Sequence, residues 1–280
     1  MRQLRFWTTA VTNFITVAAS KTLTVAASLM LCLAMLGWAL PAQADNRISP
    51  RLSEQVLQII REHPEVIIES VQAYQQQQQQ QLQQAQQAFL QQLQTNPQLA
   101  IGESPTTGAE SSKIVLIEFS DFQCPYCAEA HKTIKQFMAK HQDEVLLVYK
   151  HFPLTAAHPE ALPAAKAAWA ARQQGKFWEY QDALFTQQDK LGEALYLATA
   201  QSLNLDLEQF NGDSASAPAG LRNAADAAIG QDMQLAERLG ISGTPFFVMY
   251  GGSTKGYGEA FSGAVQLSDM ENILARVSKS

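Results

Sequence analysis

The chain has 280 residues, enough for one large domain or two small ones. Its hydrophobic content of 46% is ordinary for a globular protein with a full core. The formal net charge of −6 argues against nucleic acid as a partner, and three cysteines are too few for a fold held together by several disulfides.

Residues 1–44 are predicted to be a targeting segment. Its charged side chains are Arg2, Arg5 and Lys21. An apolar stretch covers residues 23–40, and Ala42-Gln43-Ala44 supplies the small-x-small pattern of a cleavage site before Asp45. The alternative is an uncleaved membrane anchor, because the apolar stretch is near the lower length limit for a membrane span.

With either reading of this segment, the rest of the chain is expected to be exported. Disulfides persist in the periplasm and in other oxidising compartments outside the cytoplasm. Without the three positive charges of the segment the remaining chain carries −9, and its only cysteines are Cys124 and Cys127.

Residues 45–94 are predicted to form a helical, Gln-rich stalk. Ser49-Pro50 has the pattern of a helix start, and His63-Pro64 is expected to interrupt the helix. A thin apolar seam at helical spacing lies on both sides of this interruption and ends before the glutamine run 75–81. It consists of Leu52, Val56, Ile59, Ile67, Val71 and Tyr74. Such a seam either packs against copies of the same chain, giving a dimer or trimer, or belongs to a flexible tether.

Residues 95–112 are rich in Pro, Gly, Thr and Ser, and we predict a linker there. Beyond it, residues 113–120 and 145–152 are predicted strands, and residues 128–140 a helix between them, which gives a right-handed parallel crossover. A helical section is expected at about 156–240. A strand at 246–250, a hairpin partner near 260–261 and a helix at 266–277 complete the predicted α/β domain.

The sequence Cys124-Pro125-Tyr126-Cys127 lies where the first of these strands ends and the helix begins. The unpaired N–H groups and positive dipole of a helix start stabilise a thiolate, which is the nucleophilic form of cysteine. Pro125 suits the first helical turn, because its missing N–H has no partner there. Three residues along a helix bring Cys127 close to Cys124, so the pair is predicted to be a reversible dithiol.

Two other roles are open to the cysteine pair. The pair could be half of a zinc site, but the sequence has no second cysteine pair, and the spacing of His131 and His141 does not match a zinc finger. A purely structural disulfide is the other, but so short a loop gains little stability from closure.

The segment 118–127, Glu-Phe-Ser-Asp-Phe-Gln-Cys-Pro-Tyr-Cys, resembles the active-site segment of DsbA-like thiol–disulfide oxidoreductases of the thioredoxin superfamily. Residues 243–247, Gly-Thr-Pro-Phe-Phe, resemble their cis-proline loop, and residues 175–178 resemble part of their helical insertion. The resemblance implies a thioredoxin fold with an inserted helical domain, over residues 113–280.

The same resemblance implies roles for individual residues. Cys124 would be the exposed nucleophile and Cys127 the buried resolving thiol. Pro245 would be cis and face the cysteines, and Glu118 would be a buried acid that takes a proton from Cys127. The alternative for Glu118 is an ordinary polar residue on a strand.

Two positions depart from DsbA itself, which has His where this chain has Tyr126 and Val where it has Thr244. The pattern is closer to the DsbG, BdbD and ScsC types. Without the His, one positive contribution to the thiolate is absent, so a very strongly oxidising potential is not expected. A hydrogen bond from the Thr244 hydroxyl to the sulfur is expected to tune it further.

The expected function is an exported enzyme that forms or reshuffles disulfides in client proteins, as an oxidase or an isomerase, through Cys124 and Cys127. It would need no cofactor and no metal, and a membrane redox partner would recycle it. The alternative is a non-catalytic metal-handling or holdase protein that uses the same groove.

Overall fold

The structure, a computed structural model, describes residues 49–214, 224–251 and 256–279. The chain divides into two compact units, residues 1–69 and 70–280. The predicted targeting segment, residues 1–44, lies outside the described residues and stays a prediction. Within the described ranges, every helix is too short or too polar to cross a membrane.

The first two helices of the described chain are α2 (Pro50–Glu62) and α3 (Pro64–Thr95). As predicted, Ser49 caps α2: its Oγ accepts the N–H of Leu52 at 3.2 Å, and Pro50 is the first helical residue. The glutamine run lies inside α3. The six apolar side chains of the predicted seam are 45 to 62% exposed in the single chain.

The last turns of α3 are part of the core, so the prediction of a separate stalk up to residue 94 is wrong at its C-terminal end. Phe89 and Leu93 are only 5% and 2% exposed. The Gln86 side chain donates to the carbonyl oxygen of Leu239 at 3.2 Å. These residues have the same helical spacing as the exposed seam, so periodicity alone does not separate the two parts of the helix.

The predicted linker at 95–112 is also corrected by the structure. It contains a short helix, α4 (Pro97–Ile101), whose Ala100 and Ile101 are buried, and an edge strand, β1 (Thr106–Gly108). β1 pairs antiparallel with β3. A three-residue edge strand has almost no sequence pattern of its own, because its partner strand supplies the hydrogen bonds.

In the described part of the chain, five strands form one sheet in the order β1-β3-β2-β4-β5. The strands after β1 are β2 (Ile114–Ser120), β3 (Val145–His151), β4 (Phe246–Gly251) and β5 (Tyr257–Ser262). β2 and β3 are parallel and are joined through α5 (Pro125–His141), as predicted. β4 pairs antiparallel with both β2 and β5, which confirms the predicted hairpin.

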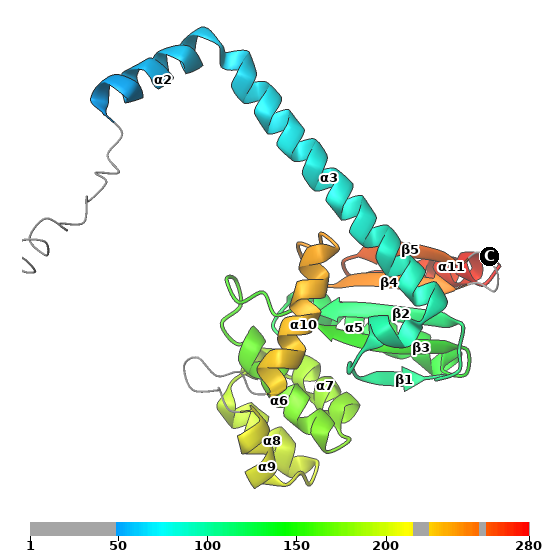
Figure 1. Cartoon of the computed structure of the whole chain (residues 1–280). Helices are drawn as coiled ribbons and strands as arrows, with labels where there is room; N and C mark the ends of the chain where they lie inside the picture. Colours follow the sequence, from blue (N-terminus) through cyan, green and yellow to red (C-terminus); the bar gives the residue numbers. More distant parts are fainter. Residues whose placement is uncertain (1–48, 215–223, 252–255, 280) are drawn as a thin grey trace, which may run out of the picture. The chain divides into compact units, whose positions relative to one another are not determined.

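Helices cover both faces of the sheet (Figure 1). One face packs against α5 and α11 (Leu267–Val277), through residues such as Leu116, Phe137 and Ile273. The other face packs against the end of α3, α4 and α10 (Ala224–Arg238), through residues such as Phe119 and Ala236.

A group of helices lies between β3 and β4, over the range in which the helical insertion is expected. Its members are α6 (Ala161–Gln173), α7 (Phe177–Thr186), the short η1 (Gln188–Lys190), α8 (Glu193–Ser202), α9 (Leu207–Ser214) and then α10. The aromatic face of α7 is buried, and the cluster that contains Phe177 and Tyr180 also contains Cys124 and Cys127. The core of the helical insertion therefore reaches the cysteine pair.

Candidate redox site at the cysteine pair

Cys124 is the N-cap residue of α5, and Pro125 is the first helical residue, as predicted. The backbone N–H of Cys124 donates to the carbonyl oxygen of Asp121 at 3.1 Å, which closes the turn between β2 and α5. The N–H of Cys127 donates to the Cys124 carbonyl oxygen at 3.0 Å. Both cysteines are free thiols in this structure.

Cys124 is much less accessible than expected. It is 4% exposed and Cys127 is 0% exposed, so the expectation of an exposed nucleophile is wrong for this structure. The Thr244 loop lies over the Cys124 sulfur, which donates to the Thr244 carbonyl oxygen at 3.3 Å. The Thr244–Pro245 bond is cis, as the resemblance implies.

The surroundings of Cys124 lower the pKa of its thiol to about 5. The largest cause is a hydrogen bond from the Cys127 thiol, and burial opposes it. The Thr244 side chain and the backbone N–H groups of Cys127 and Tyr126 act in the same direction as Cys127. The Thr244 hydroxyl is buried and has no hydrogen-bond partner among the described residues while Cys124 is a thiol, so it is available to the thiolate.

Cys127 is shifted in the opposite direction. Burial raises the pKa of its thiol, and the neighbouring Cys124 raises it further. Its sulfur accepts the N–H of Asp121 at 3.5 Å. At neutral pH, Cys124 is therefore the thiolate of the pair and Cys127 keeps its proton.

Glu118 lies on β2 and is 1% exposed. Burial raises the pKa of its carboxyl group to about 7, and the Ser120 hydroxyl opposes that shift. Both Glu118 and Cys127 raise the pKa of the Tyr149 hydroxyl, so these groups share one buried region beneath the cysteine pair. A carboxyl group with a pKa near neutrality is suited to exchanging a proton with a buried thiol.

Tyr126 lies between the cysteines, and its side chain is 62% exposed. It adds no charge near the sulfur of Cys124, and its influence on that thiol comes from its backbone N–H. Its exposed ring is available to the side chains of a protein bound at the cysteine pair.

Two further residues, Asp121 and Gln188, hydrogen-bond the segment between β2 and α5. Neither role was predicted from the sequence. The Asp121 carboxylate accepts the N–H of Gln123 at 2.8 Å and that of Leu154 at 3.0 Å, and it contacts Nδ1 of His158 at 2.7 Å. An Asp directly after a strand is a recognisable turn signal.

Gln188, from the helical insertion, is the second of these residues. Its side-chain amide donates to the carbonyl oxygens of Phe122 and Cys124, at 2.7 and 2.9 Å. No local pattern could have indicated it, because the contact spans more than sixty residues of sequence.

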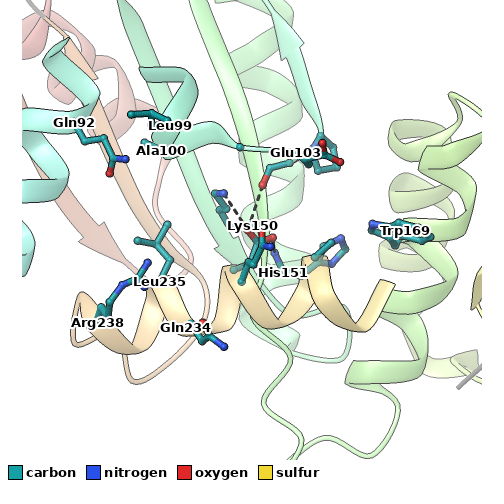
Figure 2. A pocket seen from close by; sticks show the side chains of 16 residues that line it. Gln92, Leu99, Ala100, Glu103, Lys150, His151, Trp169, Gln234, Leu235 and Arg238 are labelled. Carbon is teal, nitrogen blue, oxygen red and sulfur yellow. Dashed lines mark hydrogen bonds and ion pairs between the residues drawn. The ribbon is translucent and has the colours of Figure 1, made fainter. Parts of the chain in front are cut away.

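A cavity of about 290 Å³ lies beside β3, between α4 and α10 (Figure 2). Two of its lining residues form an ion pair: Lys150 Nζ lies 3.0 Å from Asp232 Oδ1, and it donates to the carbonyl oxygen of Ile101 at 2.9 Å. Asp232 also accepts the backbone N–H of His151 at 3.0 Å. Because these charges are buried and paired, they join α4 and α10 to β3. In the described ranges, no group of three or more His, Cys, Asp and Glu side chains is arranged to hold a metal ion.

A pair of variants tests the origin of the low Cys124 pKa. Cys127→Ala removes the strongest hydrogen-bond donor to the thiolate, so the Cys124 pKa should rise from about 5 toward the ordinary value of 9.0. Cys127→Ser keeps a donor at that position and should give a smaller rise. The measurement is thiolate absorbance against pH, and equal pKa values in the two variants would contradict this assignment.

The family model described as "Thioredoxin" matches residues 100–258. A second model, described as "Copper resistance protein ScsC N-terminal domain", matches residues 60–81. A thioredoxin-like oxidoreductase from Silicibacter pomeroyi is 31% identical, with a TM-score of 0.56, and the match covers 66% of this chain and 99% of that one. ScsC from Proteus mirabilis is 21% identical, with a TM-score of 0.53, over 82% of this chain and 98% of that one, which shows likeness of fold.

Similarity to curated proteins is confined to a part of each of them. The Na(+)/H(+) antiporter NhaA 3 of Salinispora tropica is 38% identical over 144 residues, which are 51% of this chain and 21% of that protein. The chain thus spans about a fifth of the length of the curated relatives it matches.

Proposed function

Because this chain belongs to the thioredoxin superfamily, we propose that it is a DsbA-like thiol–disulfide oxidoreductase acting on exported client proteins. The observation that carries the proposal is the opposed behaviour of its two thiols. Cys124 at the helix start has a pKa of about 5, whereas burial raises the pKa of Cys127. A reactive thiolate beside a protonated resolving thiol is the arrangement that disulfide exchange requires.

As an oxidase, the protein starts from the Cys124–Cys127 disulfide. A client thiolate attacks the Cys124 sulfur, the bond between the cysteines breaks, and Cys127 leaves and takes up a proton. A second client thiolate attacks the client's own sulfur in the mixed disulfide, which releases Cys124 as a thiolate. The client gains a disulfide and the cysteine pair is reduced.

As an isomerase, the protein starts from the dithiol. The Cys124 thiolate attacks a wrong client disulfide and forms a mixed disulfide. A different client thiol then releases Cys124, so the client is rearranged and the pair stays reduced. The low pKa of Cys124 stabilises the reduced form and favours the oxidising direction. The exposed seam of the N-terminal helices favours isomerisation if it joins copies of the chain.

We also propose a cellular location and a redox partner for the protein. Export to the periplasm, or to another oxidising compartment, is supported by the targeting pattern of residues 1–44, and the same segment would anchor the chain if it is not cleaved. An oxidase must be reoxidised after each turnover and an isomerase must be kept reduced, so a membrane redox partner is part of the proposal.

Three assays test the function. The reduced protein should accelerate reduction of insulin by dithiothreitol. The oxidised protein should restore activity to reduced ribonuclease if it is an oxidase, and the reduced protein should restore activity to scrambled ribonuclease if it is an isomerase. Inactivity in all three assays, with Cys124 shown to be reactive, would contradict an enzyme of disulfide exchange.

A second candidate function is metal handling without turnover, or a holdase that grips clients in the same groove. It is favoured by the printed name of the model that matches residues 60–81, which refers to copper resistance. Two neighbouring cysteine sulfurs are soft ligands of the kind that Cu(I) prefers, and the metal would displace the proton of Cys127. Tight Cu(I) binding that disappears in Cys124→Ser, in a protein inactive in the three assays, would favour this function.

A further inference from the structure

Four polar side chains lie buried together beneath the cysteine pair. Glu118 and Ser120 come from β2, and Tyr149 and His151 come from β3; each is at most 2% exposed. In the parallel register Glu118 lies beside Tyr149, and Ser120 beside His151. Residues two apart on a strand face the same side, so all four belong to one face of the sheet.

These side chains carry polar atoms without a hydrogen-bond partner among the described residues. They are Oε1 of Glu118, Oγ of Ser120, the hydroxyl of Tyr149 and both ring nitrogens of His151. Buried polar atoms are normally paired, because an unpaired one costs about 1–3 kcal/mol. A group of them next to a reactive thiol therefore points to a use in the reaction for at least one of its members.

Ser120 has the central position in this group. It is two residues from Glu118 on β2 and directly precedes Asp121, whose N–H donates to the Cys127 sulfur at 3.5 Å. The Ser120 hydroxyl lowers the pKa values of Glu118, Cys127 and Tyr149, so it lies close to all three groups. In this structure the Ser120 oxygen has no hydrogen-bond partner among the described residues.

We propose that Ser120 is a proton-relay residue that connects the Cys127 thiol with the Glu118 carboxylate when the protein's own disulfide forms. The inference rests on the proposed function, and deepens it by assigning the path of the proton between two groups of the site. It would explain why a hydroxyl group is buried at position 120, where packing alone needs no polar atom.

Formation of the protein's own disulfide can be written with oxidised glutathione, that is glutathione disulfide, as the oxidant. The Cys124 thiolate attacks glutathione disulfide, forms a mixed disulfide and releases one glutathione thiolate. Cys127 then gives its proton to the Ser120 oxygen while the Ser120 hydroxyl proton passes to the Glu118 carboxylate. The Cys127 sulfur attacks Cys124, the protein disulfide forms, and the second glutathione leaves as a thiolate; the pair is oxidised and glutathione is reduced.

The other groups that face this region do not replace Glu118 as the proton acceptor. Burial lowers the pKa of His151 to about 3, with Lys150 and Arg172 adding to the shift, so this ring is neutral and weakly basic. Burial also raises the pKa of Tyr149 well above its ordinary value, which keeps its hydroxyl protonated. The Asp121 carboxylate is occupied by Gln123, Leu154 and His158.

The experiment follows the reduced full-length protein after mixing with oxidised glutathione. Samples are quenched with an alkylating agent, and mass spectrometry separates the dithiol, the glutathione mixed disulfide and the protein disulfide. This resolves attack by Cys124 from resolution by Cys127. In the unmodified protein, resolution should speed up as the pH rises through about 7, because Glu118 accepts a proton only when ionised.

Ser120→Ala should slow resolution at least roughly tenfold, and the mixed disulfide should accumulate, while attack by Cys124 stays unchanged. The rise in rate near pH 7 should disappear. Ser120→Thr keeps a hydroxyl and should restore both the rate and the pH profile. Glu118→Gln should reproduce the defect, and the double variant should be no slower than Glu118→Gln alone, because both changes interrupt one path.

Tyr149→Phe is the matched control, because it removes a neighbouring buried hydroxyl that has no part in the relay. Normal resolution in Ser120→Ala, failure of a folded Ser120→Thr to restore it, or the same defect in Tyr149→Phe would each overturn the proposal. Absence of any reaction between Cys124 and glutathione disulfide would instead contradict the proposed function.

A measurement on the unmodified protein keeps the test valid if the variants do not fold. The relay moves two protons in the resolution step, so the resolution rate in mixtures of light and heavy water should depend quadratically on the deuterium fraction. A linear dependence, which corresponds to one proton in flight, would overturn the relay.

Discussion

Cys124→Ser should abolish disulfide exchange with protein clients and with glutathione, because the serine hydroxyl stays protonated where the cysteine is a thiolate. The low pKa of this thiol, about 5, depends on contacts that only a sulfur at the start of α5 receives. Exchange with reduced ribonuclease should fall to the uncatalysed rate. The same variant should retain the fold, since the side chains have similar size.

Cys127→Ser is the matched variant, with the same substitution one helical turn away. It keeps the attacking thiolate but lacks the resolving thiol, so clients should accumulate as mixed disulfides that a non-reducing gel detects. Residual exchange in Cys124→Ser, or attack through Cys127 in its place, would contradict the assignment of the nucleophile.

The sign of the pH dependence follows from the lowered pKa of Cys124. The folded reduced protein should gain stability relative to the Cys124→Ser variant as the pH rises from about 5 toward 9.0, because the thiolate is held in the native state but not in the unfolded chain. This gain should be lost as the pH falls through about 5. Denaturant unfolding of both proteins across this range measures the difference.

Removing residues 45–75 should convert a dimer or trimer into a monomer and abolish isomerase activity. The seam of Leu52, Val56, Ile59, Ile67, Val71 and Tyr74 is exposed in the single chain, and an apolar seam of this kind is commonly covered by another helix. We propose that identical chains cover it, so that two or more Cys124 thiolates face one misfolded client.

The structure decides where the deletion must end. A cut at residue 94 would also remove Phe89 and Leu93 from the core, whereas a cut at residue 75 leaves them in place. The shortened protein should keep its reaction with glutathione disulfide and lose its activity on scrambled ribonuclease. Light scattering should show a two- to threefold lower mass than for the chain that starts at residue 45.

Single substitutions distinguish the effect of the seam on self-association from the effect of shortening the helix. Ile67→Glu places a charge in the seam and should dissociate the assembly. Gln72→Glu adds the same charge on the same helix outside the seam and should leave the mass unchanged. A monomeric chain from residue 45 at micromolar concentration would contradict self-association and would favour a tethered oxidase.

The sequence by itself determined the local features of the protein. The start of α2 at Ser49-Pro50 and the cysteine pair at the start of α5 are set by neighbouring residues. The parallel crossover of β2 and β3 follows from the order strand, helix, strand in the sequence. Such features depend on helix caps, turn residues and apolar periodicity, which act over a few positions of the chain. The resemblance added the cis bond before Pro245, which composition and spacing do not indicate.

Only the tertiary structure decided the features that depend on residues distant in the sequence. β1 exists because β3 offers it a partner, and the end of α3 joins the core because the sheet presents an apolar face to it. The burial of Cys124 comes from the Thr244 loop, 120 residues away, and the hold on its carbonyl oxygen comes from Gln188. The burial of a side chain, the pairing of a strand and the pKa of a group all depend on which surfaces of the protein meet. The sequence pattern of a helix or strand does not specify which other element it packs against, so only the tertiary structure decides these features.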